Sequence, residues 1–333
     1  MLNNSTILIT GGTGSFGKKF TRMIFSKYHP KKVIIFSRDE FKQYRMGQDF
    51  PETEFPIRFF LGDIRDKSRL YRAFEGVDYV VHAAALKQVP ALEYNPTEAV
   101  KTNVDGADNI VDAAIDAGVK KVIALSTDKA VNPVNLYGAT KLVAEKIFIA
   151  ANAYAGDRVK FSVVRYGNVV GSRGSVIPFY LDLSSRGIKE FPVTDERMTR
   201  FWITLDQGGD LVFKALKESV GGEVFIPKIP SMKLVDLARA IEPECRLKHI
   251  GIRPGEKIHE TLVSQDEARD TRDEGDVYVI RSPFYRSEEM VKKYDRYPRV
   301  PGEFSYASDN NPEWLDVGDL QKMIEGLRGT EGV

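Results

Sequence analysis

The chain has 333 residues, of which 42% are hydrophobic and 29% are charged, and its formal net charge is +1. These values are typical of a globular protein with one large or two modest domains, and the small net charge argues against nucleic-acid binding. A single cysteine, Cys245, excludes an internal disulfide, and the four histidines lack zinc-ligand spacing, so we expect no metal site. The N-terminus lacks a secretory signal, and no apolar run approaches the roughly 20 residues of a membrane helix. We therefore expect a cytoplasmic protein without membrane contact.

Short β-branched runs alternate with amphipathic stretches in the first half of the chain. Phe16, Phe20, Met23 and Ile24 share one face of a predicted helix, and residues 104–117 form another. This alternation predicts an α/β fold, a Rossmann-type doubly wound parallel sheet with helices on both faces. We assign residues 1–167 to this dinucleotide-binding domain. Its predicted strands are 6–10, 33–36, 57–61, 79–82, 122–125 and 161–165.

The pattern changes from about residue 168, where glycine, proline and charged residues become frequent. We predict that residues 168–333 form a smaller mixed α/β region that binds the substrate, with some segments returning to the first domain. Residues 224–226 read as a strand, and residues 232–241 read as a helix with Ser231 as its N-cap. The tail at 282–311 is rich in Tyr, Pro, Arg and Asp, which predicts mostly loop.

A glycine-rich turn follows the first predicted strand directly. The segment Gly11-Gly12-Thr13-Gly14-Ser15-Phe16-Gly17 fits G-x-x-G-x-x-G and leads into a helix. Glycines there permit a tight turn and close approach of the backbone to a pyrophosphate, whose charge the helix N-terminus stabilises. The predicted cofactor residues in this turn are Gly11, Gly14, Ser15, Phe16 and Gly17.

The second strand ends with Ser37 and Arg38. NAD enzymes usually place an acid there for the ribose hydroxyl, whereas a small hydroxyl beside a guanidinium suits a 2′-phosphate. Asp39 and Glu40 follow closely, which leaves NAD open, but the pattern favours NADP. Residues at the ends of the third and fourth strands complete the predicted cofactor site: Asp63, Ile64, Ala83 and Ala84.

Tyr137 and Lys141 are four residues apart and share one face of a predicted helix. An ammonium group near a tyrosine, together with a positively charged nicotinamide, lowers the pKa of its phenol, so that the phenolate can remove a proton from a sugar hydroxyl. Thr127, at the end of the fifth strand, is placed to hydrogen-bond the same hydroxyl. These three residues predict a site that oxidises an alcohol beside the nicotinamide.

Five motifs carry a family resemblance over nearly the whole chain: TGGTGSFG, AAALKQVP, STDKAVNPVNLYGATK, VVRYGNVVGSRGSV and GIRPGEK. Together they resemble the extended short-chain dehydrogenase/reductase superfamily. Within it, the chain is similar to the soluble, inverting UDP-N-acetylglucosamine 4,6-dehydratases of pseudaminic acid synthesis. Related dTDP-glucose dehydratases have glutamate in place of Lys129, and simple 4-epimerases usually have neither Asp128 nor Lys129.

The resemblance implies a distinct role for each of these two residues. Lys129 would remove the C5 proton once C4 has been oxidised, and Asp128 would protonate the departing C6 hydroxyl. A lysine base needs a pKa lowered towards neutrality, which a positive nicotinamide or partial burial would provide. The implied net reaction loses water, recycles NADP and gives the L-arabino 4-keto sugar, UDP-2-acetamido-2,6-dideoxy-β-L-arabino-hex-4-ulose. The competing interpretation is a solvated ion pair of no consequence.

The resemblance also implies the contacts of UDP-N-acetylglucosamine. Lys87 would lie near the sugar, Asn168 near the diphosphate, and arginines would grip the phosphates. Family members assemble as dimers or hexamers, so we expect a homo-oligomer. The expected substrate-binding residues are Lys87, Asn168, Thr199, Arg200, Arg253 and Glu256.

Three alternatives stay open at this point. The first is a retaining UDP-sugar 4,6-dehydratase, although such relatives are longer and carry membrane segments. The second is a UDP-hexose epimerase, which needs only Tyr137 and the cofactor. The third is a catalytically inactive NADP-binding protein, against which the intact Thr127, Tyr137 and Lys141 argue.

Overall fold

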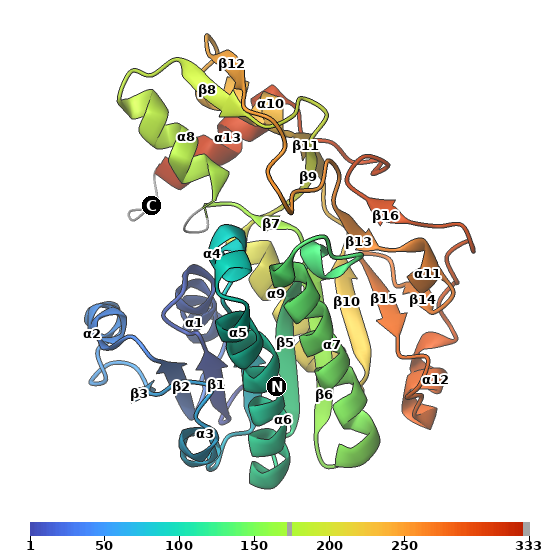
Figure 1. Ribbon diagram of the computed structural model, residues 1–333. Helices are drawn as coiled ribbons and strands as arrows, with labels where there is room; N and C mark the ends of the chain where they lie inside the picture. Colours follow the sequence, from blue (N-terminus) through green and yellow to red (C-terminus); the bar gives the residue numbers. More distant parts are fainter. Residues whose placement is uncertain (172–174, 329–333) are drawn as a thin grey trace.

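A nine-stranded sheet forms the centre of the larger part of the chain (Figure 1). The computed structural model describes residues 1–171 and 175–328. The strand order is β14-β15-β10-β6-β5-β4-β1-β2-β3, and it is parallel from β3 to β10. The order β3-β2-β1-β4-β5-β6 is that of a doubly wound dinucleotide-binding fold, so the predicted fold class is confirmed. The strands are β1 (Thr6–Thr10), β2 (Lys32–Ser37), β3 (Ile57–Leu61), β4 (Tyr79–His82), β5 (Lys121–Thr127), β6 (Lys160–Tyr166), β10 (Glu223–Pro227), β14 (Thr271–Asp273) and β15 (Val277–Arg281).

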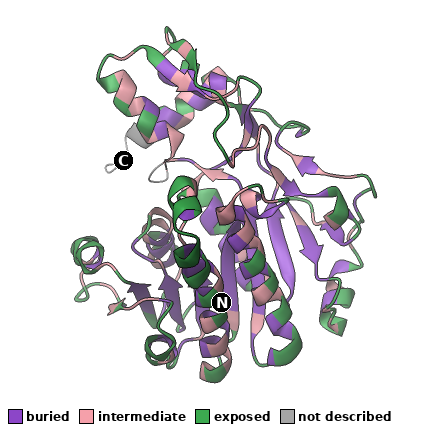
Figure 2. Ribbon diagram, viewed as in Figure 1, coloured by how far each residue is buried: buried purple, intermediate pink, exposed green. Residues whose placement is uncertain are grey.

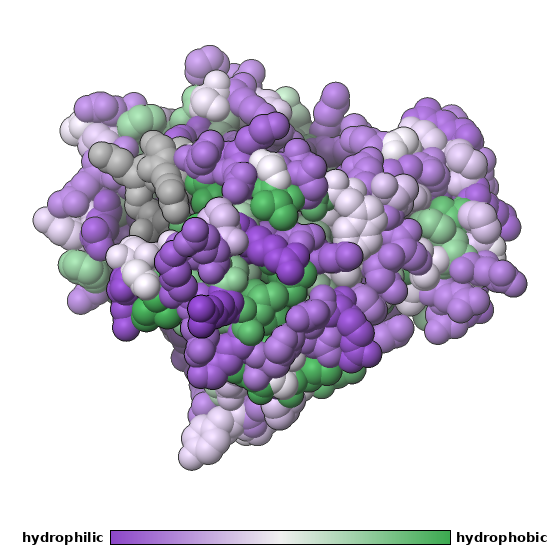
Figure 3. Space-filling model, turned by 90° about the horizontal axis from the view of Figure 1, so that it is seen from above, coloured by the Kyte–Doolittle hydropathy of each residue, from purple (hydrophilic) through white to green (hydrophobic). Residues whose placement is uncertain are grey.

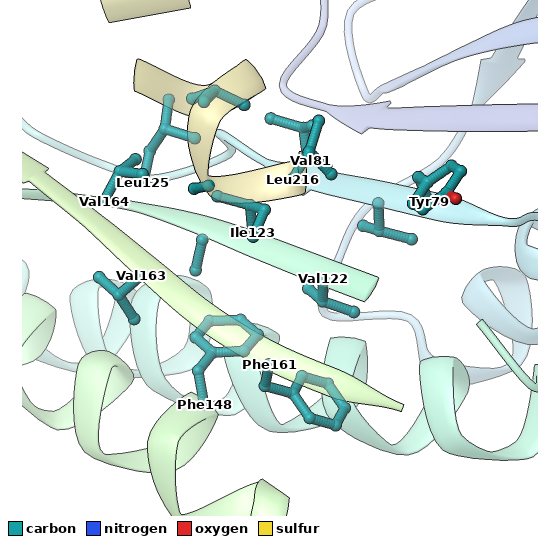
Figure 4. Close-up of a cluster of buried hydrophobic side chains, with 14 of the residues drawn as sticks. Tyr79, Val81, Val122, Ile123, Leu125, Phe148, Phe161, Val163, Val164 and Leu216 are labelled. Atoms are coloured by element: carbon teal, nitrogen blue, oxygen red, sulfur yellow. The ribbon is translucent and has the colours of Figure 1, made fainter. Parts of the chain in front are cut away.

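Helices cover both faces of this sheet. Helices α3 (Lys67–Phe74), α6 (Gly106–Ala117) and α7 (Leu136–Ala155) pack side by side on one face, and α1 (Ser15–Lys27) packs against α9 (Leu205–Glu218) on the other. In Figure 4, Phe148 of α7 and Leu216 of α9 approach strand β5 from opposite sides. The central strands are therefore buried on both faces, as Figure 2 shows. The remaining elements of this half are α2 (Glu40–Asp49), α4 (Val89–Tyr94), α5 (Pro96–Val100), the π-helix η1 (Lys101–Asp105) and the 3-10 turn η2 (Asp128–Ala130).

A smaller region lies beyond the carboxyl ends of the parallel strands, at the top of Figure 1. It contains the sheets β11-β9-β7 and β12-β8 and has its own hydrophobic cluster, with Phe191, Trp202 and Leu237 among its members. Figure 3, which views the molecule from above, shows a mostly hydrophilic face there. Its elements are β7 (Asn168–Val169), α8 (Val176–Ser185), β8 (Glu190–Val193), β9 (Thr199–Ile203), β11 (Ser231–Lys233), α10 (Leu234–Ile241), β12 (Arg246–His249) and α13 (Val317–Arg328).

One sequence-based expectation in the second half needs correction. The helix predicted at 232–241 begins at Leu234, because Ser231–Lys233 instead forms strand β11, which pairs with β9. Ser231 is therefore not its N-cap. The tail at 282–311 is mostly loop, as expected, and its two regular elements are α12 (Glu288–Tyr294) and β16 (Tyr306–Ala307), of which β16 pairs with β13 (Thr261–Val263). Short helix α11 (Gln265–Ala268) lies between β13 and β14.

Two kinds of feature are absent from the part of the chain that the structure describes. No helix there is long and apolar enough to cross a membrane. No group of three or more His, Cys, Asp or Glu side chains there is arranged to hold a metal ion.

Candidate active site

A cavity of about 690 Å³ opens at the carboxyl ends of β1, β2, β4 and β5, between the large sheet and the smaller region. In parallel α/β sheets, ligands bind at this edge, where the strand order reverses. The cavity is lined by all thirteen residues expected to hold the cofactor, which are Gly11, Gly14, Ser15, Phe16, Gly17, Ser37, Arg38, Asp63, Ile64, Ala83, Ala84, Tyr137 and Lys141. The sequence motifs, which are spread over 131 positions, thus converge on one surface.

Glycines in the turn after β1 let neighbouring backbone segments pack closely together. Gly11 has φ +64°, and a Cβ there would lie 2.8 Å from the backbone of Ala84. A Cβ at Gly17 would lie 2.4 Å from Gly12, so the helix can approach the strand only through glycine. Gly14 is the N-cap of α1 and provides no side-chain cap, which leaves N–H groups of the first turn available to an anion. This cradle fits a dinucleotide pyrophosphate.

Two cations line the cavity near the end of β2. Arg38 follows the strand directly, and Lys42 lies in the first turn of α2. The Arg38 guanidinium lies 3.7 Å from the Asp63 carboxylate, and Lys42 pairs with Asp39 at 2.7 Å. Ser37 is buried, and its hydroxyl accepts a hydrogen bond of 3.2 Å from the Gln43 amide. Lys42 was not predicted, since only the first turn of α2 brings it to this strand end.

Tyr137 and Lys141 lie in the first two turns of α7 and line the cavity. The Lys141 Nζ donates a 2.7 Å hydrogen bond to the Leu125 carbonyl, and burial lowers the pKa of Lys141 to about 8. Burial also raises the pKa of Tyr137 above its ordinary value, although Lys129 and Thr127 act in the opposite direction. In the protein alone, the cation that opposes the effect of burial on Tyr137 is Lys129. The expected lowering of the Tyr137 pKa by Lys141 together with a positive nicotinamide concerns the cofactor-bound enzyme and stays a prediction.

Asp128 and Lys129 form a largely buried ion pair directly after Thr127, in which the Asp128 side chain is fully buried and the Lys129 side chain is 25% exposed. Asp128 is fully buried, and its Oδ1 accepts hydrogen bonds from the Thr127 hydroxyl at 2.8 Å and from Lys129 Nζ at 3.0 Å. Lys129 lines the cavity, whereas Asp128 lies behind it. The interpretation as a solvated surface pair is wrong, because a fully buried carboxylate costs free energy unless it is paired.

The surroundings of Lys129 contain a carboxylate that the sequence did not indicate. Glu260 Oε1 lies 3.4 Å from Lys129 Nζ, and Glu260 is buried. Burial by itself would lower the pKa of Lys129, but Asp128 and Glu260 together raise it above its ordinary value. Burial therefore produces no net lowering of the Lys129 pKa in the protein alone, and lowering by a positive nicotinamide stays a prediction. Glu260 was missed because it approaches Lys129 only in the folded chain, 131 positions away along the sequence.

Of the residues expected to bind the substrate, Lys87 and Asn168 line the cavity. Burial lowers the pKa of Lys87, and the charge of Lys129 adds to this effect. The side-chain oxygen of Asn168 is buried and has no hydrogen-bond partner among the described residues. Both side chains can therefore meet a ligand. Trp202 also lines the cavity and was not predicted.

The other four expected substrate residues lie outside the cavity lining. The Thr199 hydroxyl hydrogen-bonds to His259 and Ser308, at 2.9 and 2.6 Å. Arg200 donates to the backbone carbonyls of Thr199, Ile258 and Lys257. Arg253 is exposed, and the Glu256 carboxylate accepts from its backbone N–H at 3.3 Å.

Comparisons with known proteins agree with this arrangement. Residues 7–282 match the family model described as polysaccharide biosynthesis protein. A UDP-N-acetylglucosamine 4,6-dehydratase (inverting) from Campylobacter jejuni is 51% identical, with 99% of this chain and 100% of the relative covered. A protein named UDP-glucose 4-epimerase from Rickettsia bellii is 43% identical, over 98% of this chain and 97% of its own length.

Two solved structures show the same fold. Pen from Bacillus thuringiensis has a TM-score of 0.89 and 37% identity, and covers 98% of this chain and 99% of its own. DesIV, a dTDP-glucose 4,6-dehydratase from Streptomyces venezuelae solved with NAD bound, has a TM-score of 0.68 and 22% identity, covering 76% of this chain and 86% of its own. The chain therefore belongs to the polysaccharide biosynthesis protein family of the extended short-chain dehydrogenase/reductase superfamily.

Proposed function

We propose that the protein is a UDP-N-acetylglucosamine 4,6-dehydratase that inverts C5, a hydro-lyase with a recycled NADP. The observation that carries this proposal is the buried Asp128–Lys129 pair, 3.0 Å apart, beside Thr127 and at the wall of a dinucleotide-sized cavity. Oxidation alone does not need this pair, whereas elimination of water needs both a base and an acid. The Campylobacter relative's name supports the same substrate.

The oxidation step uses Thr127, Tyr137 and Lys141. The Tyr137 phenolate takes the proton of the C4 hydroxyl, and the Thr127 hydroxyl orients that group. The Lys141 ammonium, anchored on the Leu125 carbonyl, stabilises negative charge that develops on the phenolate. A nicotinamide held in this cavity by the glycine turn, Tyr137 and Lys141 would supply the acceptor for the C4 hydride and the donor of a hydride to C6.

The elimination step uses the pair. Lys129 must be a neutral amine to take the C5 proton, and Asp128 must carry a proton to give to the C6 hydroxyl, which leaves as water. Proton transfer across the 3.0 Å contact, from the ammonium to the carboxylate, produces both forms at once. This transfer reconciles a lysine that is charged at rest with its role as a base. Reprotonation of C5 on the opposite face then completes the inversion.

The cofactor preference rests on Arg38 and Lys42. Both side chains line the cavity next to Ser37, where the 2′-position of the adenine ribose is expected. Two cations suit a 2′-phosphate, which supports NADP. In the structure Arg38 pairs with Asp63 and Lys42 pairs with Asp39. The preference for NADP therefore requires both cations to leave these carboxylates and contact the 2′-phosphate when it binds.

Lys87 and Asn168 are the proposed contacts of the sugar and the diphosphate, since both line the cavity. Thr199, Arg200, Arg253 and Glu256 are proposed as substrate contacts on the family resemblance alone. The same resemblance supports a cytoplasmic homo-oligomer that acts in a pseudaminic acid-type pathway.

The test is to incubate the protein with NADP and UDP-N-acetylglucosamine in deuterated water and to follow the product by NMR. The proposal predicts loss of water, a 6-methyl group, deuterium at C5 and the L-arabino configuration. An unchanged sugar would refute the dehydratase. Deuterium at C5 with the D-configuration would instead indicate a retaining dehydratase.

A UDP-hexose 4-epimerase is the second candidate, because relatives with that name match nearly the whole chain. An epimerase would give a C4 epimer without a methyl group and without solvent deuterium. The buried Asp128–Lys129 pair argues against it, because epimerisation at C4 has no step that requires a C5 base.

A further inference from the structure

Glu260 is a buried carboxylate that faces the proposed base from the second half of the chain. It lies immediately before strand β13, is only 3% exposed, and places its Oε1 3.4 Å from Lys129 Nζ. Its Oε2 is buried and has no hydrogen-bond partner among the described residues. An anion in such a setting costs free energy unless a cation compensates for it. The Lys129 ammonium is the nearest such cation, since Arg200 Nε is 3.9 Å away.

The backbone around Glu260 fixes this position. The Glu260 N–H donates to the Ser308 hydroxyl at 2.9 Å, and the Ser308 N–H donates to the Glu260 carbonyl at 2.8 Å. The Ser308 hydroxyl also contacts the Thr199 hydroxyl at 2.6 Å. Three segments far apart in the sequence thus hold the backbone of Glu260 in place, while its Oε1 lies near Lys129, which lines the cavity.

We infer that Glu260 is a positioning residue that sets the pH range in which Lys129 can act as the C5 base. This inference rests on the proposed function. A carboxylate near an amine stabilises the ammonium form, so it determines how readily Lys129 gives up its proton. Asp128 is the second carboxylate in contact with Lys129, and it has its own role as the acid. Glu260 has no such role and acts through Lys129.

The balance of charge around Lys129 makes this contribution large. Its raised pKa results from Asp128 and Glu260 acting against burial. Cations on other elements oppose these two carboxylates, so removal of either anion leaves Lys129 mostly among positive groups. The groups that face Lys129 are Asp128, Glu260, Arg200, Tyr137, Lys87 and Lys257.

The test compares Glu260→Gln with wild type and with Asp309→Asn, a carboxylate-to-amide control in the same tail. Asp309 is half exposed, and its carboxylate lies 3.9 Å from the His259 imidazole. The rate of deuterium incorporation at C5 is measured from pH 5 to 10 with UDP-N-acetylglucosamine and NADP. Formation of reduced cofactor, at 340 nm in a single turnover, monitors the C4 oxidation separately.

We plot the rate of deuterium incorporation at C5 against pH and call its rise on the acidic side the acidic limb. We expect Glu260→Gln to shift this limb to lower pH by about one unit or more, because an opposite charge at this distance shifts a pKa by about that amount. The Asp309→Asn limb should match wild type. Formation of reduced cofactor should stay within about twofold at the plateau pH, because the charged groups that Glu260 contacts are Lys129 and Arg200 and not the oxidation residues Tyr137 and Lys141. A merely structural role would lower the rates at every pH without moving the limb.

An unmoved limb in a folded Glu260→Gln protein would overturn the inference, even if its rates fell. Folding is checked by thermal melting and NADP binding. If that variant does not fold, Glu260→Asp serves instead. The aspartate keeps the negative charge but places it farther from Lys129. The acidic limb of this variant should therefore shift in the same direction as that of Glu260→Gln, by a smaller amount. An unchanged limb would again refute the role of Glu260. Absence of any 4-keto product from wild type would instead refute the proposed function, and the inference with it.

Discussion

The carbonyl oxygen of Lys129 lies so close to Gly138 that a Cβ at position 138 would be 2.0 Å from it. Gly138 is the third residue of α7, directly after Tyr137, and its N–H is capped by the Asn135 side chain at 2.8 Å. The glycine therefore lets the helix that carries Tyr137 pack against the turn that carries Asp128 and Lys129. This close packing helps to hold Tyr137 beside Asp128 and Lys129.

Gly138→Ala should push the start of α7, with Tyr137, away from the turn that contains Asp128 and Lys129. The added methyl group meets backbone rather than a flexible side chain, so we expect a loss of unfolding free energy of about 1–3 kcal/mol and a large loss of turnover. Gly326→Ala is the matched control, because Gly326 is an exposed helical glycine whose Cβ would meet nothing within 4 Å. Urea denaturation and product formation measure both effects. Equal stability of the two variants would contradict the close packing.

Lys129→Ala should abolish elimination while leaving the cofactor bound. Without the amine no group is placed to take the C5 proton, so deuterium incorporation should fall by at least about 100-fold. NADP affinity, measured by fluorescence titration, should be nearly unchanged. The exposed Lys101→Ala serves as the control. Near wild-type dehydration by Lys129→Ala would show that another residue is the base.

Lys141→Met should impair the earlier step. The methionine keeps most of the side-chain volume but removes the ammonium bound to the Leu125 carbonyl. Reduced cofactor should form at least about 100-fold more slowly in single-turnover absorbance. Lys146→Met, an exposed position on the same helix, should behave as wild type. A normal rate of C4 oxidation in Lys141→Met would exclude the proposed role.

Arg38→Ala should weaken NADP binding selectively. Loss of a charge-assisted contact to the 2′-phosphate costs about 1.5–3 kcal/mol, which is a rise of about 10- to 100-fold in Kd for NADP. The Kd for NAD should change little, because NAD lacks that phosphate. Arg58→Ala removes an exposed arginine from the neighbouring strand as a control. An equal effect on both cofactors in isothermal titration would argue against NADP specificity.

His82 should make the fold sensitive to acid. It is buried, its Nδ1 lies 2.8 Å from the Thr10 hydroxyl, and burial, with the charge of Lys141, lowers its pKa to about 3. The unfolded chain, with a pKa near 6.5, binds the proton more readily. Stability from this group is therefore complete above pH 6.5 and is lost as the pH falls towards 3, by up to about 1.4 kcal/mol per pH unit.

His82→Gln should reduce the dependence of the unfolding free energy on pH below about 6.5. Unfolding free energies from urea titrations at pH 4 to 7 give the slope, and the exposed His29→Gln provides the comparison. If His82→Gln keeps the wild-type slope, the imidazole does not titrate on unfolding in this range.

The sequence by itself determined the parallel sheet and the cofactor surface. Buried β-branched strands, the glycine turn and the Tyr137–Lys141 spacing are local patterns, and parallel strands necessarily bring their carboxyl ends to one edge. Tertiary structure decided the rest. Helix α10 begins two residues later than the sequence predicts, because Ser231–Lys233 pairs with β9 as a strand. The protonation of Lys129 depends on burial and on Glu260, which lies 131 positions away and contacts it only after folding. Electrostatic energy depends on distance in space, and no local pattern of residues records that distance.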